Sequence, residues 1–285
     1  NPGDNWSLER LCELAGMSRT SFTSKFSACV SMSPMEYITF WRMQIARKML
    51  VGMIGNYFTL LDWFAKHPEE ERQVIRAPLF IVGLPRTGTS AMHGLLHTDP
   101  GNRSPLFWEV NTPLPRPHPD HIDDDPRIEQ LQKQLEMQYR LAPGFRAIHK
   151  MDARMPQEDI ANMQQMLYGI TLSLSWYVPS YRKWLMQADP EPALRFHRRF
   201  LQMLQATEPA DRPIDRWLLK TPDHLGSLPA IFKLFPDAQV VFTHRNPVDV
   251  IGSVCSFTWT LSAMFTDKSG LKPNFYSVSG TNLFN

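Results

Sequence analysis

The strongest constraint on the fold is an apolar run that ends in a glycine- and hydroxyl-rich turn, Leu79-Phe-Ile-Val-Gly-Leu-Pro-Arg-Thr-Gly-Thr-Ser90. Its first residues are typical of a buried parallel strand, and the hydroxyl residues at its end are typical of a helix start. Where a tight loop joins such a strand to a helix, backbone N–H groups converge and the helix dipole favours negative charge. The segment therefore predicts an anion-binding loop.

The spacing of the two glycines in this loop narrows the range of ligands that it can bind. Gly83 and Gly88 match the G-x-x-x-x-G pattern of nucleotide-binding loops, but the lysine expected next is replaced by Thr89. The basic residue lies inside the loop instead, as Arg86. Because the chain also offers no convincing acidic partner for Mg²⁺, a nucleoside-triphosphate kinase is the weaker interpretation.

Two further runs predict strands of the same sheet, at Arg216–Lys220 and at 239–243, each short, apolar and partly β-branched. Helical patterns separate them, which indicates an α/β fold with a mainly parallel sheet. A helix carrying Ile54, Phe58, Leu61 and Phe64 on its apolar face is predicted to end at His67-Pro68. Residues 113–126 are expected to form an irregular loop and 269–285 an irregular tail.

A second anion signal follows the last predicted strand, in Thr243-His-Arg-Asn-Pro-Val-Asp-Val-Ile-Gly-Ser253. Asn246 is expected to cap a helix whose first residue is Pro247. Ligands of open α/β sheets bind at the carboxyl edge of the strands, where Arg245 would emerge. A guanidinium there, with the Ser253 hydroxyl, can hold a second phosphate.

The first fifty residues predict two short helices around Gly16, then a helix that Ser33-Pro-Met-Glu36 begins. This segment resembles the DNA-binding region of AraC-type transcription regulators, through Trp6-Ser-Leu-Glu-Arg-Leu-Cys-Glu-Leu-Ala-Gly-Met-Ser-Arg-Thr-Ser-Phe22 and the residues around Ser33. That family carries two such units, and the resemblance places Arg19, Thr20 and Lys25 on or beside the recognition helix. With one unit, few phosphates can be contacted, so we expect weak or no DNA binding.

From about Asn56 to Ser262 the chain resembles the bacterial branch of the sulfotransferases that use 3′-phosphoadenosine-5′-phosphosulfate (PAPS). The motifs are the 78–90 loop, Asp99-Pro100, Trp108-Glu109, Leu219-Lys-Thr-Pro-Asp-His-Leu225 and Phe235-Pro-Asp-Ala-Gln-Val-Val-Phe-Thr-His-Arg-Asn-Pro247. The resemblance implies a P-loop-type three-layer α/β sandwich. It implies that the 5′-phosphosulfate is held by Arg86, Thr87, Gly88, Thr89 and Ser90, and the 3′-phosphate by Arg245 and Ser253.

Sulfuryl transfer to a hydroxyl or amine needs a base for the acceptor proton, and the first candidate is Glu109, which follows the apolar Leu106-Phe-Trp108. Glu158, Asp159 and His149 remain alternatives. Lys220, at the end of a predicted strand, is expected to reach the bridging oxygen or the sulfonate, and His224 to orient its neighbours. A sulfonate carries less charge than a γ-phosphate, so no metal is expected.

Composition sets the remaining expectations. The net charge of +2 argues against broad binding of nucleic acid, and three separated cysteines predict neither disulfides nor a zinc site. The longest apolar stretch, about 166–178, is too short to span a bilayer and is expected to be a buried helix. With no signal pattern, the protein is predicted to be cytoplasmic. Aromatic residues near Pro179 can line a pocket for a small-molecule or lipid-like acceptor (Trp176, Tyr177, Tyr181, Trp184).

The predicted organisation is a helix-turn-helix fragment at 1–51, a sulfotransferase-like domain at 52–268 and the tail. The resemblance fades near Asp267, which favours a domain truncated at its C-terminal side. Two alternatives to an active enzyme therefore stay open: a DNA-binding regulator whose α/β part senses a nucleotide, and an inactive truncated sulfotransferase.

Overall fold

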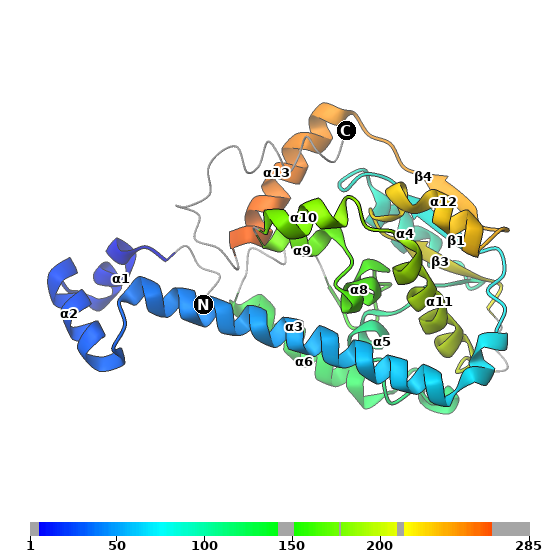
Figure 1. The fold of residues 1–285 in the computed structure, drawn as a ribbon, viewed down its shortest axis with the longest axis horizontal. Helices are drawn as coiled ribbons and strands as arrows, with labels where there is room; N and C mark the ends of the chain where they lie inside the picture. Colours follow the sequence, from blue (N-terminus) through cyan, green and yellow to red (C-terminus); the bar gives the residue numbers. More distant parts are fainter. Residues whose placement is uncertain (1–5, 142–150, 177, 210–213, 264–285) are drawn as a thin grey trace.

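A computed structural model of the chain describes residues 6–141, 151–176, 178–209 and 214–263 (Figure 1). The strands are β1 (Leu79–Val82), β2 (Asn102–Arg103), β3 (Arg216–Lys220) and β4 (Gln239–Phe242). The α-helices are α1 (Leu8–Ala15), α2 (Arg19–Val30), α3 (Pro34–Lys66), α4 (Thr89–Leu96), α5 (Phe107–Asn111), α6 (Pro126–Leu141), α8 (Ile160–Met163), α9 (Ile170–Ser175), α10 (Pro179–Leu185), α11 (Glu191–Gln205), α12 (His224–Leu234) and α13 (Pro247–Ala263). Short 3₁₀ turns are η1 (Pro68–Arg72), η2 (Pro119–His121) and η3 (Gln164–Met166).

The described strands form one sheet in the order β2-β3-β1-β4, and all three pairings are parallel. In the centre, Phe80 of β1 is in register with Leu219 of β3 and Val240 of β4. The α/β fold and the three strands expected from the sequence are thus confirmed, and β2 is an addition. Because the strands are parallel, β1, β3 and β4 end at the same edge.

The sheet lies between two layers of helices. Phe80 and Val82 of β1 belong to the largest apolar core, which also contains buried side chains of α11, α12 and the C-terminal part of α3. The alternate residues Leu79 and Ile81 form a second cluster that contacts α4 on the other face. This alternation follows from the two-residue period of a strand, and it yields the expected three-layer arrangement.

The helical start of the chain is confirmed in detail. Ser7 and Ser18 accept N-cap hydrogen bonds at α1 and α2, and Gly16 ends α1 in the left-handed conformation. Ser33 and Glu36 form the predicted capping box, with Pro34 at the first helical position. Each capping side chain satisfies an N–H that has no partner within the helix.

The helix α3 differs from expectation because it continues through Val51 without a break and is 33 residues long (Figure 1). No proline occurs between Pro34 and Pro68, and Gly52 and Gly55 cost only about 1 kcal/mol each within a helix, so neither ends it. The predicted apolar face is also wrong in part. Ile54, Phe58 and Leu61 are exposed, whereas Leu60 and Phe64 are buried in the large core.

One smaller expectation also differs. The stretch 166–178 is not one helix: Leu167 and Gly169 have positive φ and separate η3 from α9. Positive φ takes the backbone out of the right-handed helical region and interrupts helical hydrogen bonding, so the chain turns there. The segment 113–126 is irregular as expected, except for η2 and for Pro126, which begins α6. His149, Tyr177 and the tail lie outside the described residues.

Within the described part of the chain, no helix is long and apolar enough to cross a membrane.

Candidate functional site

The loop between β1 and α4 has the backbone conformation of a tight anion cradle. Arg86 and Gly88 both have positive φ, 71° and 94°, and Gly88 is the N-cap of α4. Among the residues that the structure describes, no side chain caps that end of the helix, so none of them accepts from its first N–H groups. Thr87 donates a hydrogen bond to the Leu84 carbonyl across the loop. This is the geometry that the sequence analysis expects of a loop that binds an anion at a helix start.

Gly83 brings the ends of two strands together at this loop. A Cβ at Gly83 would lie 2.8 Å from the Thr243 carbonyl oxygen and 2.9 Å from Thr87 Oγ1. The Thr87 and Thr243 hydroxyls are themselves 2.8 Å apart and share a hydrogen bond. Sequence reasoning missed the role of Thr243; its signal was a hydroxyl residue directly after a predicted strand. Only glycine permits this close approach.

The two predicted anion sites contact each other. Arg86 Nε donates a hydrogen bond of 3.0 Å to Ser253 Oγ, across 167 residues of sequence. The Arg86 guanidinium also lies over the ring of Phe257, 5.7 Å from its centroid. Loop and helix α13 are therefore joined on the same side of the sheet, at the carboxyl edge of β1 and β4.

Arg245 lies at the same edge, and its side chain contacts the helix α13 that follows it. It follows the end of β4, and its Nε is 3.8 Å from the Asp249 carboxylate, with both side chains about half exposed. Asn246 caps α13 as expected, by accepting from the Val248 N–H at 3.0 Å. The guanidinium of Arg245 is thus accessible, whereas Ser253 is already bonded to Arg86.

A third contact joins the loop to β3. Lys220 is buried at the end of that strand, and its Nζ donates to Ser90 Oγ at 3.1 Å and to the Glu158 carboxylate. Glu158 is partly exposed, with 26% of its side chain accessible. The structure therefore joins Ser90, Lys220 and Glu158 at one edge of the sheet.

Glu109, the first candidate for the base, lies in a different environment. Its side chain is fully buried, and its two oxygens accept from Arg103 and from the backbone N–H of Leu106 at the start of α5. Arg103 also bonds Glu208 and lies over the ring of Trp217, near the start of β3. Trp217 and Lys220 are three residues apart along the strand, about 10 Å. These contacts make Glu109 a helix cap and ion-pair partner.

Asp159, another alternative for the base, is buried directly behind Glu158. Its carboxylate accepts from His224 Nε2 at 2.6 Å and is 3.6 Å from His197 Nε2. Burial alone would raise the pKa of this carboxyl, but His197 and the hydrogen bond from His224 outweigh it and keep the pKa below its usual range. With no exposed oxygen, Asp159 cannot take a proton from an external acceptor.

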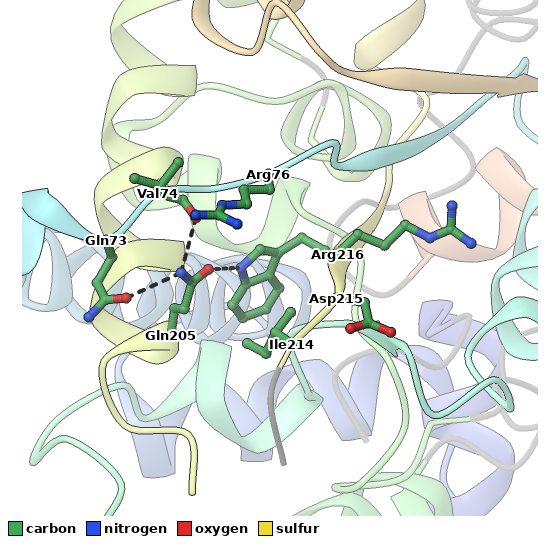
Figure 2. Close-up of a pocket in the computed structure, with 8 residues that line it drawn as sticks. Gln73, Val74, Arg76, Gln205, Ile214, Asp215 and Arg216 are labelled. Atoms are coloured by element: carbon green, nitrogen blue, oxygen red, sulfur yellow. Dashed lines mark hydrogen bonds between the residues drawn. The ribbon is translucent and has the colours of Figure 1, made fainter. Parts of the chain in front are cut away.

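A cavity of about 300 Å³ occurs at the opposite edge of the sheet (Figure 2). It lies where the chain approaches β1 and β3, and Gln205 spans it with hydrogen bonds to Gln73, Val74 and Trp217. The predicted anion ligands are absent from its lining residues. Among the described residues, no group of three or more His, Cys, Asp or Glu side chains is arranged to hold a metal ion.

A parallel sheet between two layers of helices, with a tight loop after its central strand, places the chain in the α/β class of folds. The sequence model of the sulfotransferase family matches residues 78–275, and the chain belongs to that family. The model of bacterial regulatory helix-turn-helix proteins of the AraC family matches residues 1–39. Both resemblances drawn from the sequence are thus confirmed.

Solved structures and curated relatives agree with this division. Sulfotransferase STF9 from Mycobacterium avium is 27% identical with a TM-score of 0.74, and the match covers 85% of this chain and 62% of that one. Sulfotransferase STF1 from Mycobacterium tuberculosis is 29% identical with the same TM-score, over 87% and 68%. AraC-like transcription regulators of Streptomyces lividans and Streptomyces antibioticus match over 50 residues, at 34% and 32% identity. The chain spans 16% of the length of each regulator.

Proposed function

We propose that this chain transfers a sulfuryl group from PAPS to a hydroxyl or amine acceptor. The observation that carries the proposal is the hydrogen bond from Arg86 to Ser253, which joins two anion sites distant in sequence. PAPS has two anionic ends, a 5′-phosphosulfate and a 3′-phosphate. Adjacent sites at one sheet edge suit a single ligand of that kind.

The residues at the edge fit the donor chemically. The start of α4, with Thr89 and Ser90 in its first turn, offers backbone N–H groups and a hydroxyl to the 5′-phosphosulfate. Arg86, Thr87 and Gly88 would complete that end. The exposed guanidinium of Arg245 and the hydroxyl of Ser253 would hold the 3′-phosphate, because a guanidinium matches phosphate geometry. None of these groups needs a metal ion to bind.

For the base we now propose Glu158 in place of Glu109. Glu158 is partly exposed and bonds Lys220, which in turn bonds Ser90 of the loop. Transfer breaks the bond from sulfur to the bridging oxygen and forms one to the acceptor, whose proton passes to Glu158. Lys220 and Arg86 would stabilise the charge that develops on the leaving oxygen.

The acceptor is a small or lipid-like molecule in this proposal, and the reaction takes place in the cytoplasm. Tyr181 and Trp184 of α10 supply aromatic surface, and Trp184 is about half exposed. Exposed aromatic rings favour an acceptor with an apolar body.

Calorimetric titration with adenosine 3′,5′-bisphosphate, without magnesium, tests the donor site. We expect the wild-type chain to bind and Arg86→Ala to weaken binding about 10- to 100-fold, because one charged hydrogen-bond donor is lost. Arg76→Ala is the matched control: this arginine lines the cavity at the opposite edge and should leave the affinity unchanged. Absence of binding by the wild-type protein would refute the proposal.

A second candidate function is DNA binding by residues 1–51. It is favoured by the capped α1–α2 pair, on which Arg19 is largely exposed. Because one unit contacts few phosphates, we propose that binding is weak and salt-dependent. Fluorescence anisotropy with a labelled duplex at increasing salt tests it. If the chain acted as a regulator rather than an enzyme, the nucleotide would change the affinity for a specific duplex, and Arg86→Ala would abolish that change. No acceptor would then be sulfated.

A further inference from the structure

A buried carboxylate–histidine cluster lies directly behind the Glu158–Lys220 pair, and the mechanism above does not use it. Asp159 follows Glu158 in the chain, yet its carboxylate is fully buried while that of Glu158 is partly exposed. Neighbouring residues thus direct their carboxylates to opposite sides of the backbone. One faces the loop, and the other faces the core.

The cluster connects four elements around Asp159. His224, the first residue of α12, donates to its Oδ2 at 2.6 Å, and His197 of α11 lies 3.6 Å from its Oδ1. The Asp159 N–H donates to the Lys220 carbonyl at 3.1 Å, and the Asp159 carbonyl accepts from Asn162 in α8. Asp159 therefore holds both the residue before it and the end of β3.

Its surroundings leave the cluster little freedom to move. His224 packs edge-on against Phe80 of β1, with ring centroids 4.9 Å apart, and both side chains are completely buried. His197 bonds Asn162 at 3.2 Å in the same interior. A buried charge is costly unless it is paired and hydrogen-bonded, and these contacts to His224 and His197 supply the partners of the Asp159 carboxylate.

We infer that Asp159 and His224 are positioning residues for the Glu158–Lys220 pair. The hydrogen bond between them fixes the backbone on either side of that pair, so Lys220 Nζ is held within reach of Ser90 and Glu158. Neither residue contacts the reactants. This inference rests on the proposed function, which gives Lys220 a place beside the sulfuryl group.

The experiment compares two nucleotides by calorimetry: PAPS, which carries the sulfuryl group, and adenosine 3′,5′-bisphosphate, which lacks it. No acceptor is needed. The quantity of interest is the preference for PAPS, measured as the ratio of the two dissociation constants. We expect His224→Ala to lower this preference about fivefold while the affinity for the bisphosphate changes less than about twofold. Lys220→Met should lower it equally.

Combining the two substitutions separates positioning from general destabilisation. If His224 acts through Lys220, the double variant should show no further loss beyond Lys220→Met, a strongly non-additive result. His224→Gln can donate from nearly the position of Nε2 and should restore the preference. Phe200→Leu, a core change in α11 that lowers the melting temperature, should leave it intact. If His224→Ala does not fold, His224→Asn, whose donor falls short of Asp159, takes its place.

The outcomes are distinct. If the wild-type chain binds neither nucleotide, the proposed function fails, and this inference with it. Suppose that the wild-type chain binds both nucleotides and prefers PAPS. If His224→Ala keeps this preference, or if its loss of preference adds to that of Lys220→Met in the double variant, the positioning role is overturned while the donor site stands. If Lys220→Met leaves the preference unchanged, Lys220 does not face the sulfuryl group, and the inference is equally overturned.

Discussion

Two glutamates with similar local sequence contexts occupy opposite environments. Glu109 and Glu158 each follow an apolar or proline-containing segment, but Glu109 is enclosed by Arg103 and the Leu106 N–H. Glu158 keeps part of its side chain accessible beside Lys220. A general base needs an open path to the acceptor proton, so contact geometry separates the two.

Substituting each glutamate by glutamine distinguishes them. Glu158→Gln should lower the rate of sulfuryl transfer about 100-fold, because the amide cannot accept the acceptor proton. Glu109→Gln should keep that rate per folded molecule and lower the free energy of unfolding by about 3 kcal/mol, because Arg103 loses a buried charge partner. Release of adenosine 3′,5′-bisphosphate with a panel of phenol and alcohol acceptors measures the first effect, and urea denaturation the second. The reverse pattern would restore Glu109 as the base.

Gly83 gives a second prediction at the scale of single residues. Gly83→Ala would push a methyl group against the Thr243 carbonyl and the Thr87 hydroxyl, so the loop must shift. We expect a loss of about 2 kcal/mol in stability and weaker binding of the bisphosphate. Gly94→Ala in α4 is the control, since its Cβ meets open space and alanine favours the helix by up to about 1 kcal/mol. Equal stability and equal bisphosphate affinity in the two variants would contradict the close approach of Gly83 to Thr243 and Thr87.

At the scale of elements, α3 shows how packing overrides a local pattern. Its N-terminal part continues from the α1–α2 pair, and its C-terminal part contacts the core through Leu60 and Phe64. The apolar residues at 54, 58 and 61 also recur at helical spacing, so the sequence offers two overlapping apolar faces. Contact with η3, η1 and α11 selects the one that contains Leu60.

Alanine substitutions test which face of α3 is buried. Leu60→Ala should cost about 3 kcal/mol of unfolding free energy, because it removes a completely buried side chain from the large core. Phe58→Ala removes a larger side chain that is 62% exposed and should change stability by no more than about 0.5 kcal/mol. Urea denaturation followed by tryptophan fluorescence compares them. A larger loss from Phe58→Ala would show that the other face is the buried one.

At the scale of the whole molecule, buried histidines couple stability to pH. Burial lowers the pKa of His93 and of His197 to about 4, from an ordinary value of 6.5. Each must stay neutral in the folded protein. Its contribution to the free energy of unfolding is therefore complete above pH 6.5 and is lost as the pH falls toward 4. Asp223 acts in the opposite direction, since burial raises its pKa to about 6 and its contribution is lost as the pH rises from 3.8 through 6.

The net prediction is acid destabilisation, because burial also lowers the pKa of His97, so three histidines oppose Asp223. The free energy of unfolding should fall as the pH falls from 6.5 to 4, and His93 alone contributes up to about 1.4 kcal/mol per pH unit to this fall. His93→Gln removes that contribution, so the free energy of unfolding should fall less steeply in the variant over the same range. Urea denaturation at pH 4.5, 5.5 and 6.5 measures both proteins. An unchanged slope in the variant would rule out His93 as the source.

The sequence by itself determined the class of the fold and the position of the tight loop between β1 and α4. Strand period, the glycine spacing at 83 and 88, and the capping signals at Ser33 and Asn246 are local, and local sterics and hydrogen bonding decide them. Tertiary structure alone decided that Arg86 contacts Ser253, that Lys220 contacts Glu158, and that Glu109 is enclosed by Arg103. These pairings join residues far apart in the chain, and their geometry depends on how strands and helices pack. No local pattern encodes which carboxylate is left accessible, because burial is a property of the assembled core.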